Sequence, residues 1–107
     1  PLCLAGCSCG AFVTSHAVVR LHPVRDLQRV VLVGAAASRF DLAELPAELH
    51  SRSLVIHGEQ DDTVPLESVM AWARPQVLPV LVVPTVGHFF HGQLPLLRDT
   101  VLRHLRT

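Results

Sequence analysis

The 107-residue chain contains no lysine, asparagine or tyrosine, and its nine basic residues are all arginine. The arginines form no stripe along the sequence, so we attribute this bias to a GC-rich bacterial gene rather than to function. Nine acidic residues balance them, and the formal net charge is zero. A balanced charge offers no attraction to nucleic acid or to an anionic membrane surface, so neither is expected as a partner.

Long hydrophobic runs are also absent, although half of the residues are apolar. The apolar runs fall far short of the roughly 20 residues that a membrane-spanning helix needs. No charged leader followed by an apolar signal segment is visible, and we expect a cytoplasmic protein. One small core is feasible at this length, so a single domain is predicted over residues 1–107.

Cysteine is scarce and confined to one place, with Cys3, Cys7 and Cys9 in the first ten residues. An odd number at this spacing makes no disulfide framework, and the spacing does not match the usual zinc sites. We expect packed, reduced thiols, in keeping with a reducing compartment. A thiol or metal site on these cysteines is the weaker alternative, and no metal or other cofactor is expected.

Apolar segments alternate with helical patterns along the chain. Strands that are apolar on both sides and separated by helices predict a parallel sheet. The expected fold class is α/β, a three-layer αβα sandwich of about four parallel strands with helices on both faces. Strands are expected at residues 2–5, 30–33, 53–58 and 79–84, and helices at residues 10–21, 65–74 and 94–105, with a less clear short helix at 41–45.

The most informative stretch is Gly6-Cys7-Ser8-Cys9-Gly10, a serine between two glycines directly after an apolar strand. It matches the G-x-S-x-G pattern of a nucleophile elbow. A sharp strand-to-helix turn strains the serine backbone, and the positions two residues away must lack bulk for the turn to close. The serine oxygen then lies above the carboxyl edge of the sheet, near free N–H groups of the helix. An ordinary small residue at a tight turn is the alternative.

Two further strand ends carry groups that suit a serine nucleophile. Asp61 and Asp62 follow the third predicted strand, and His88 follows the fourth, directly after Gly87. The functional loops of a parallel sheet lie at the carboxyl ends of its strands, so these groups are expected to meet Ser8 there. The chain order Ser…Asp…His is that of the α/β-hydrolase triad.

The chain resembles the C-terminal half of an α/β-hydrolase, close to the small bacterial dienelactone-hydrolase-like and esterase-like members. The order and the separations of three motifs match, and the resemblance covers essentially the whole chain. The motifs are the elbow, the acid turn His57-Gly58-x-x-Asp61-x-x-Val64-Pro65, and the turn Gly87-His88-Phe89.

This resemblance implies a serine hydrolase that cleaves small carboxylic esters through an acyl-enzyme on Ser8. His88 would be the general base, and Asp61 would orient it and stabilise its charged form. The family's acid stands three residues after the glycine of the motif, which favours Asp61 over Asp62. The backbone N–H of Cys9 would be one donor of the oxyanion hole.

The neighbouring polar residues have simpler interpretations. Asp62 is expected to be a charge near a helix N-terminus. Glu59 and Gln60 are expected to be solvated turn residues, and His57 to be a packed histidine at a strand end. His91 lies close to His88, but the Gly-His pair favours His88 as the base.

A complete α/β-hydrolase has several strands before its elbow, and a loop after an early strand supplies the second oxyanion donor. We therefore expect a half-built oxyanion hole, and the loss of one donor typically costs about 10²–10³ in turnover. The strand within residues 1–5 becomes a sheet edge, through which we expect a homo-oligomer. A separate chain or a longer gene product that holds the other strands is the alternative. The rival function is a catalytically silent fragment that acts as an oligomerisation or interaction module.

Overall fold

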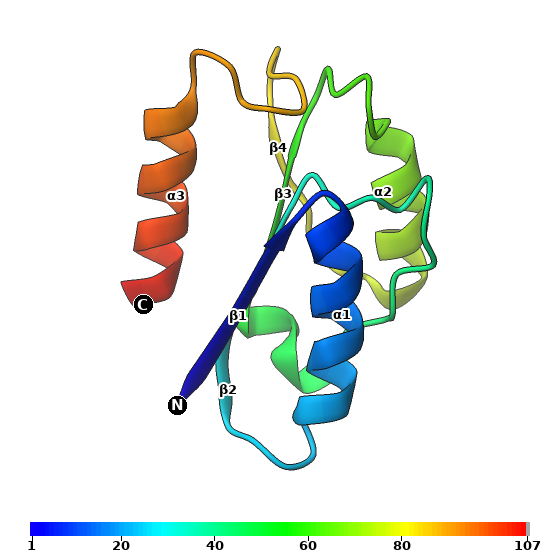
Figure 1. Cartoon of the computed structure of the whole chain (residues 1–107), viewed down its shortest axis with the longest axis vertical. Coiled ribbons are helices and arrows are strands. Elements are labelled where there is room, and N and C mark those ends of the chain that lie inside the picture. The colour runs from blue at the N-terminus through cyan, green and yellow to red at the C-terminus, as the bar shows by residue number, and fades with distance from the viewer. Residues whose placement is uncertain (107) are drawn as a thin grey trace.

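A computed structural model describes residues 1–106 and contains one four-stranded sheet in which every neighbouring pair of strands is parallel (Figure 1). The predicted α/β fold class is confirmed. The strands are β1 (Leu2–Cys7), β2 (Leu27–Val33), β3 (Ser53–Gly58) and β4 (Leu81–Val83). The helices are α1 (Cys9–Leu21), α2 (Leu66–Ala73) and α3 (Leu94–Arg106), with 3-10 helices η1 (Ala47–Arg52) and η2 (Arg74–Gln76).

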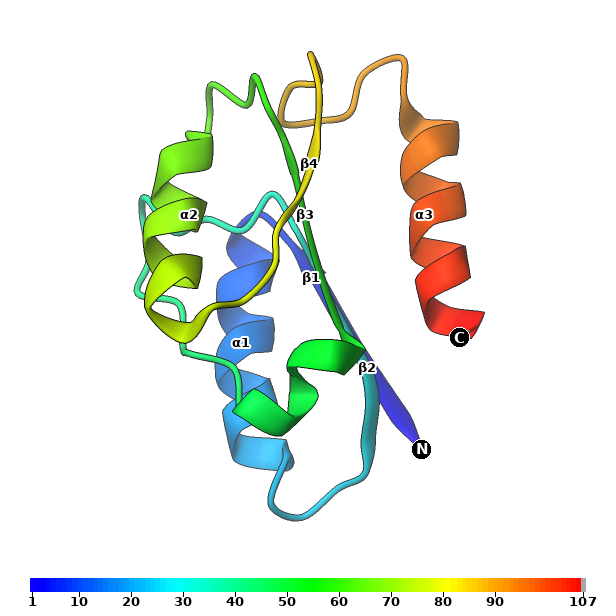
Figure 2. The ribbon, with the colours of Figure 1, turned by 180° about the vertical axis from the view of Figure 1, so that it is seen from behind.

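The strands follow one another across the sheet in chain order, β1-β2-β3-β4. Because they all run in the same direction, their carboxyl ends lie at one edge of the sheet. The turn after β1 and the loops after β3 and β4 therefore meet at this edge, which is uppermost in Figure 2. This is the place where the sequence predicts the functional groups.

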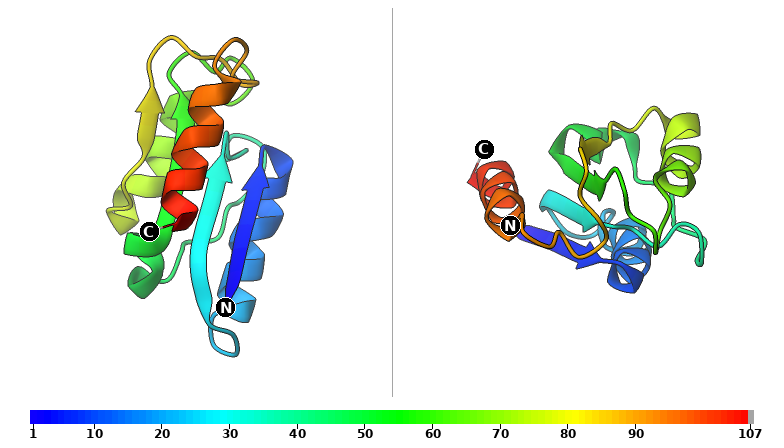
Figure 3. Two further views of the ribbon diagram at one scale, coloured as in Figure 1. Left: turned by 90° about the vertical axis from the view of Figure 1, so that its left-hand side faces the viewer. Right: turned by 90° about the horizontal axis from the view of Figure 1, so that it is seen from above.

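Helices cover both faces of the sheet. The two views in Figure 3 show α1 and α2 on one face and α3 on the other. Successive side chains of a strand point to opposite faces, so Val55 of β3 joins the large core under α1 and α2, whereas Ile56 joins a smaller cluster on the α3 side. Phe90, which is 1% exposed, belongs to this smaller cluster and anchors the loop after β4.

Helix α3 is only loosely packed. It has no buried residue, although Leu97 and Val101 are half-buried against the sheet. The helical spacing of Leu94, Leu97, Val101, Leu102 and Leu105 predicts that these side chains form one inner face. The prediction is wrong for Leu94, Leu102 and Leu105, which are 59%, 38% and 40% exposed. An open apolar groove of about 290 Å³ lies between α3 and the strands β1 and β2, and Leu97 and Val101 line it from the side of α3. No helix within residues 1–106 is long and apolar enough to cross a membrane.

The short helix predicted at residues 41–45 is absent, and this segment is coil without regular secondary structure. Its backbone groups bond to side chains of other elements instead of to one another. The Ala43 N–H donates to Ser15 Oγ (3.0 Å), and the Ala43 carbonyl accepts from Trp72 Nε1 (3.2 Å). The Leu45 N–H donates to Gln76 Oε1 (3.0 Å). These tertiary hydrogen bonds replace the helical ones.

The expected packing of the cysteines is also wrong, because Cys3, Cys7 and Cys9 are all exposed. Side chains alternate along β1, and Leu2 and Leu4 pack against the core under α1. Cys3 and Cys7 therefore point to the other face, where Cys7 lines the open groove beside α3.

The loose packing of α3 generates a stability prediction. Leu32→Ala, at a fully buried position, should lower the free energy of unfolding by about 2–5 kcal/mol. Leu102→Ala, at a position that is 38% exposed, should lower it by less than about 1 kcal/mol. Urea denaturation of the 107-residue chain measures both. An equal loss for the two variants would contradict the open packing of α3.

Candidate active site

Ser8 joins β1 to α1 with an uncommon backbone conformation, φ 53° and ψ −122°. Its N–H donates to the carbonyl oxygen of Val33 (2.9 Å). Its own carbonyl oxygen accepts hydrogen bonds from the N–H groups of Ala11 (3.1 Å) and Ala36 (3.3 Å). A non-glycine residue at such an angle costs about 1–3 kcal/mol and persists only where its surroundings impose it. The strained turn predicted for an elbow is therefore present at Ser8.

The two glycines of the elbow have different surroundings. A Cβ atom on Gly6 would lie 2.5 Å from the carbonyl oxygen of Gly10 and would also collide with the Thr14 hydroxyl. A Cβ atom on Gly10 would meet no described atom within 4 Å. The expectation that both positions must lack bulk is confirmed for Gly6. It is wrong for Gly10, which lies on the exposed side of the first turn of α1.

Asp61 follows β3 in a turn that its own carboxylate closes. Oδ1 accepts hydrogen bonds from the N–H groups of Thr63 (2.9 Å) and Val64 (2.7 Å). The Asp61 side chain is only 1% exposed, whereas Asp62 is exposed. Of the two candidate acids, the structure turns Asp61 towards the interior.

The loop after β4, which carries His88, is tied to this acid turn. The Gln60 N–H donates to the Val86 carbonyl oxygen (2.9 Å), and Glu59 Oε1 accepts from the Thr85 N–H (3.0 Å). Glu59 is exposed as expected, yet its carboxylate also holds the neighbouring loop. The acid and the histidine therefore sit on two loops that are hydrogen-bonded to each other.

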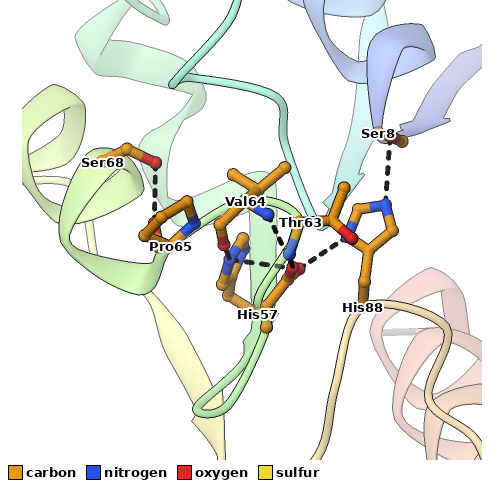
Figure 4. A network of polar contacts seen from close by, with 8 residues as sticks. Ser8, His57, Thr63, Val64, Pro65, Ser68 and His88 are labelled. Atoms are coloured by element: carbon orange, nitrogen blue, oxygen red, sulfur yellow. Dashed lines mark hydrogen bonds and ion pairs between the residues drawn. The ribbon is translucent and has the colours of Figure 1, made fainter.

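His88 bridges the serine and the acid (Figure 4). Its Nδ1 lies 2.6 Å from Asp61 Oδ2, and its Nε2 lies 3.1 Å from Ser8 Oγ. A carboxylate oxygen only accepts, so Nδ1 carries the proton, and Nε2 accepts from the serine hydroxyl. The structure thus brings Ser8, Asp61 and His88 together, whereas His91 is exposed. Such a chain can remove the hydroxyl proton as the oxygen attacks a carbonyl group.

A small apolar pocket of about 210 Å³ opens beside this serine. The Phe89 ring packs edge-on against His88 with 5.0 Å between centroids, and it is 78% exposed. The pocket continues towards the groove beside α3, because the two share three lining residues. The pocket residues are Cys7, Ser8, Val33, His88, Phe89, Phe90 and Leu97, of which Cys7, Val33 and Leu97 are shared.

Solved structures of hydrolases match nearly the whole chain. An α/β serine hydrolase without a lid from Xanthomonas campestris is 32% identical with a TM-score of 0.79, over 98% of this chain and 46% of its own. An α/β serine hydrolase homologue from Coxiella burnetii is 30% identical with a TM-score of 0.70, over 96% and 48%. A protein of unknown function from Agrobacterium tumefaciens is 19% identical with a TM-score of 0.78, over 97% and 49%, and shows the fold alone.

The resemblance to an α/β-hydrolase is confirmed. The chain spans about half the length of these solved structures. No protein-family model matches the sequence, and no curated protein matches it significantly.

Two glycines of this candidate site have steric roles that the sequence does not reveal, although Gly58 belongs to the acid-turn motif. Gly34 follows β2 with φ +55°, and a Cβ atom there would lie 3.1 Å from His88 Cε1 and 3.7 Å from Asp61 Oδ2. A Cβ atom on Gly58 would lie 2.8 Å from the Gly87 carbonyl oxygen. Gly34 leaves room for the His88 ring, and Gly58 lets the loop after β4 approach β3. The sequence signal that could have indicated them is a glycine at the end of the second predicted strand and another at the end of the third.

The backbone N–H of Cys9 lies directly beside the candidate nucleophile. Cys9 is the first residue of α1, a position where the N–H has no acceptor within the helix. This N–H group directly follows the serine and is free of helical hydrogen bonding, at the position predicted for the oxyanion donor. Within residues 1–106, no group of three or more His, Cys, Asp or Glu side chains is placed to hold a metal ion.

The unequal glycines of the elbow give the second prediction. Gly6→Ala should lower the free energy of unfolding by about 1–3 kcal/mol, because the added methyl group collides with the first turn of α1. Gly10→Ala should leave it unchanged or raise it by about 0.5–1 kcal/mol, because alanine favours the helix. Chemical denaturation measures both. Equal damage from both variants would show that the turn needs the two glycines alike.

Proposed function

We propose that this α/β-hydrolase is a serine esterase that cleaves small carboxylic esters. The observation that carries the proposal is the hydrogen-bonded chain from the Ser8 hydroxyl through His88 to the buried Asp61 carboxylate. Ser8 is the nucleophile, His88 its general base, and Asp61 the group that orients the imidazole ring. The strained backbone at Ser8 supports the assignment, since strain of this kind is concentrated at functional sites.

The proposed reaction has two halves. Ser8 Oγ attacks the ester carbonyl carbon while His88 Nε2 takes the hydroxyl proton, and the Cys9 N–H donates to the developing oxyanion. His88 returns that proton to the departing alcohol oxygen, which leaves the acyl group on Ser8. A water molecule then attacks the acyl carbon while His88 Nε2 takes its proton. The bond from the acyl carbon to Ser8 Oγ breaks, His88 returns the proton to Oγ, and the carboxylic acid leaves. Asp61 stabilises the charged imidazole in both halves.

The pocket supports a small, apolar acyl group. Its volume of about 210 Å³ is below the roughly 300–1,000 Å³ of sites that hold drug-sized ligands. The exposed Phe89 leaves the entrance open. The Xanthomonas structure is described as lidless, and we propose that this chain also works without a lid, on short esters such as acetates and butyrates.

A second candidate function, an oligomerisation or interaction module, is favoured by one observation. Strand β1 pairs only with β2, and its free edge carries no charged side chain. Proteins commonly protect such an edge with charge, proline or a covering element. We propose that two copies pair through residues 1–5. We also propose a cytoplasmic location, because three free thiols suit a reducing compartment.

The esterase proposal is tested by the hydrolysis of p-nitrophenyl butyrate. Ser8→Ala should lower kcat/KM by at least about 10³-fold, because the acyl-enzyme can no longer form. Asp61→Asn should lower it by about 10²–10⁴-fold, since the imidazole loses the partner that sets its tautomer. Release of p-nitrophenol by each purified variant is the measurement.

Two matched controls accompany these variants. Asp62→Asn changes the neighbouring exposed acid, and Cys9→Ala removes a thiol but keeps the backbone N–H, so both should stay close to wild type. Equal rates for wild type and Ser8→Ala would exclude the serine mechanism. The turnover would then come from another nucleophile, and the interaction module would become the leading function.

The edge-pairing proposal has its own measurement. Light scattering should give twice the single-chain mass for the wild type. Cys3→Lys should give the single-chain mass, because a charge on an exposed position of the edge opposes pairing. A single-chain mass for the wild type would exclude self-association.

A further inference from the structure

His57 is a buried polar group that the proposed reaction leaves unused. It is the one histidine within residues 1–106 that is fully buried, at 0% exposure. Its Nε2 lies 2.7 Å from the carbonyl oxygen of Val64 and 3.4 Å from Asp61 Oδ2. Its Nδ1 is buried and has no hydrogen-bond partner. The sequence analysis predicts a packed histidine here, but packing alone does not explain these contacts.

The proton of His57 can be located from its partners. A carbonyl oxygen only accepts, so Nε2 carries the proton and donates to Val64. Nδ1 is then an acceptor with no donor. A buried polar atom without a partner is destabilising, and an apolar side chain of similar size would avoid it. The contact that histidine makes here, and that an apolar side chain would not, is the one from its Nε2–H group.

Both the N–H and the carbonyl oxygen of Val64 are hydrogen-bonded to side chains. Its N–H donates to Asp61 Oδ1 (2.7 Å), and its carbonyl oxygen accepts from His57 (2.7 Å). Asp61 Oδ1 is thereby committed to the turn, and Oδ2 is left to face His88 Nδ1 (2.6 Å). The Nε2 atom of His57 also lies 3.4 Å from Asp61 Oδ2, where the positive end of its N–H group stabilises the carboxylate charge.

We propose that His57 is a positioning residue, which fixes the turn of Asp61 and through it the orientation of His88. This inference rests on the proposed function. His57 does not line the pocket beside Ser8, so it should influence the chemical step and not the binding of the ester. A small misplacement of a catalytic group costs up to about 10²-fold in rate.

Two substitutions separate the hydrogen bond from the packing. His57→Phe keeps a ring in the core and removes both nitrogens, and should lower kcat for p-nitrophenyl butyrate by about 10–100-fold with KM nearly unchanged. His57→Gln supplies a new Nε2–H donor towards Val64 and should recover most of kcat. His57→Met, with a flexible side chain of similar size, replaces the phenylalanine variant if that variant does not fold.

His50 provides a matched control. It too has its Nε2 in contact with a loop carbonyl oxygen, that of Leu45 at 3.0 Å, but it makes no contact with the triad. His50→Phe should therefore keep kcat and KM close to wild type, even if it lowers the melting temperature as much as His57→Phe. Equal losses of kcat in the two variants would show that His57 acts only on stability.

A second readout does not depend on activity. The proton between His88 Nδ1 and Asp61 should give a downfield resonance in the proton NMR spectrum of the wild type. His57→Phe should move or broaden this resonance, and His57→Gln and His50→Phe should not. An unchanged resonance in folded His57→Phe would overturn the inference. Absence of ester hydrolysis by the wild type would instead overturn the proposed function, and the resonance would still decide the role of His57.

Discussion

The backbone of Ser8 is held in a high-energy conformation by hydrogen bonds to both its N–H group and its carbonyl oxygen. Its N–H is bonded to the end of β2, and its carbonyl oxygen is bonded to α1 and to the segment after β2. The approach of β1 to α1 at Gly6 closes the same turn. Strand β1, helix α1 and the end of β2 together fix the backbone of Ser8, so its hydroxyl projects from the sheet edge. The other groups of the candidate site lie around this hydroxyl.

The Asp61 carboxylate is the second organising group. Its two oxygens have separate tasks, since Oδ1 closes the turn after β3 and Oδ2 faces His88. Burial strengthens each of these electrostatic contacts and makes an unpaired carboxylate costly. Glu59 Oε1 accepts a hydrogen bond from the next loop and the Gln60 N–H donates one to it, so the turn of Asp61 and the loop of His88 are fixed relative to each other. The acid, the histidine and their two loops thus form one connected network rather than three independent positions.

Much of this arrangement was predictable from the sequence, because it depends on local patterns. The glycines around Ser8, the apolar strands, and the acid and histidine after two strand ends together indicate the fold and the positions of the three residues. Contacts between distant segments were not predictable. The coil at residues 41–45 replaces a helix because Ser15, Trp72 and Gln76 supply its hydrogen bonds. The exposure of the cysteines, likewise, depends on how far α3 covers β1.

The hydrogen bond between Ser8 and His88 joins residues that are 80 positions apart. Closing so large a loop has an entropic cost that local structure cannot offset early in folding. The serine and the histidine therefore come within hydrogen-bond distance only after the strands that carry them have aligned. The chain can form its helices and its first strand pair without a working site. The contact between Ser8 and His88 would thus form as one of the last events of folding and be lost with the first opening of the loop after β4.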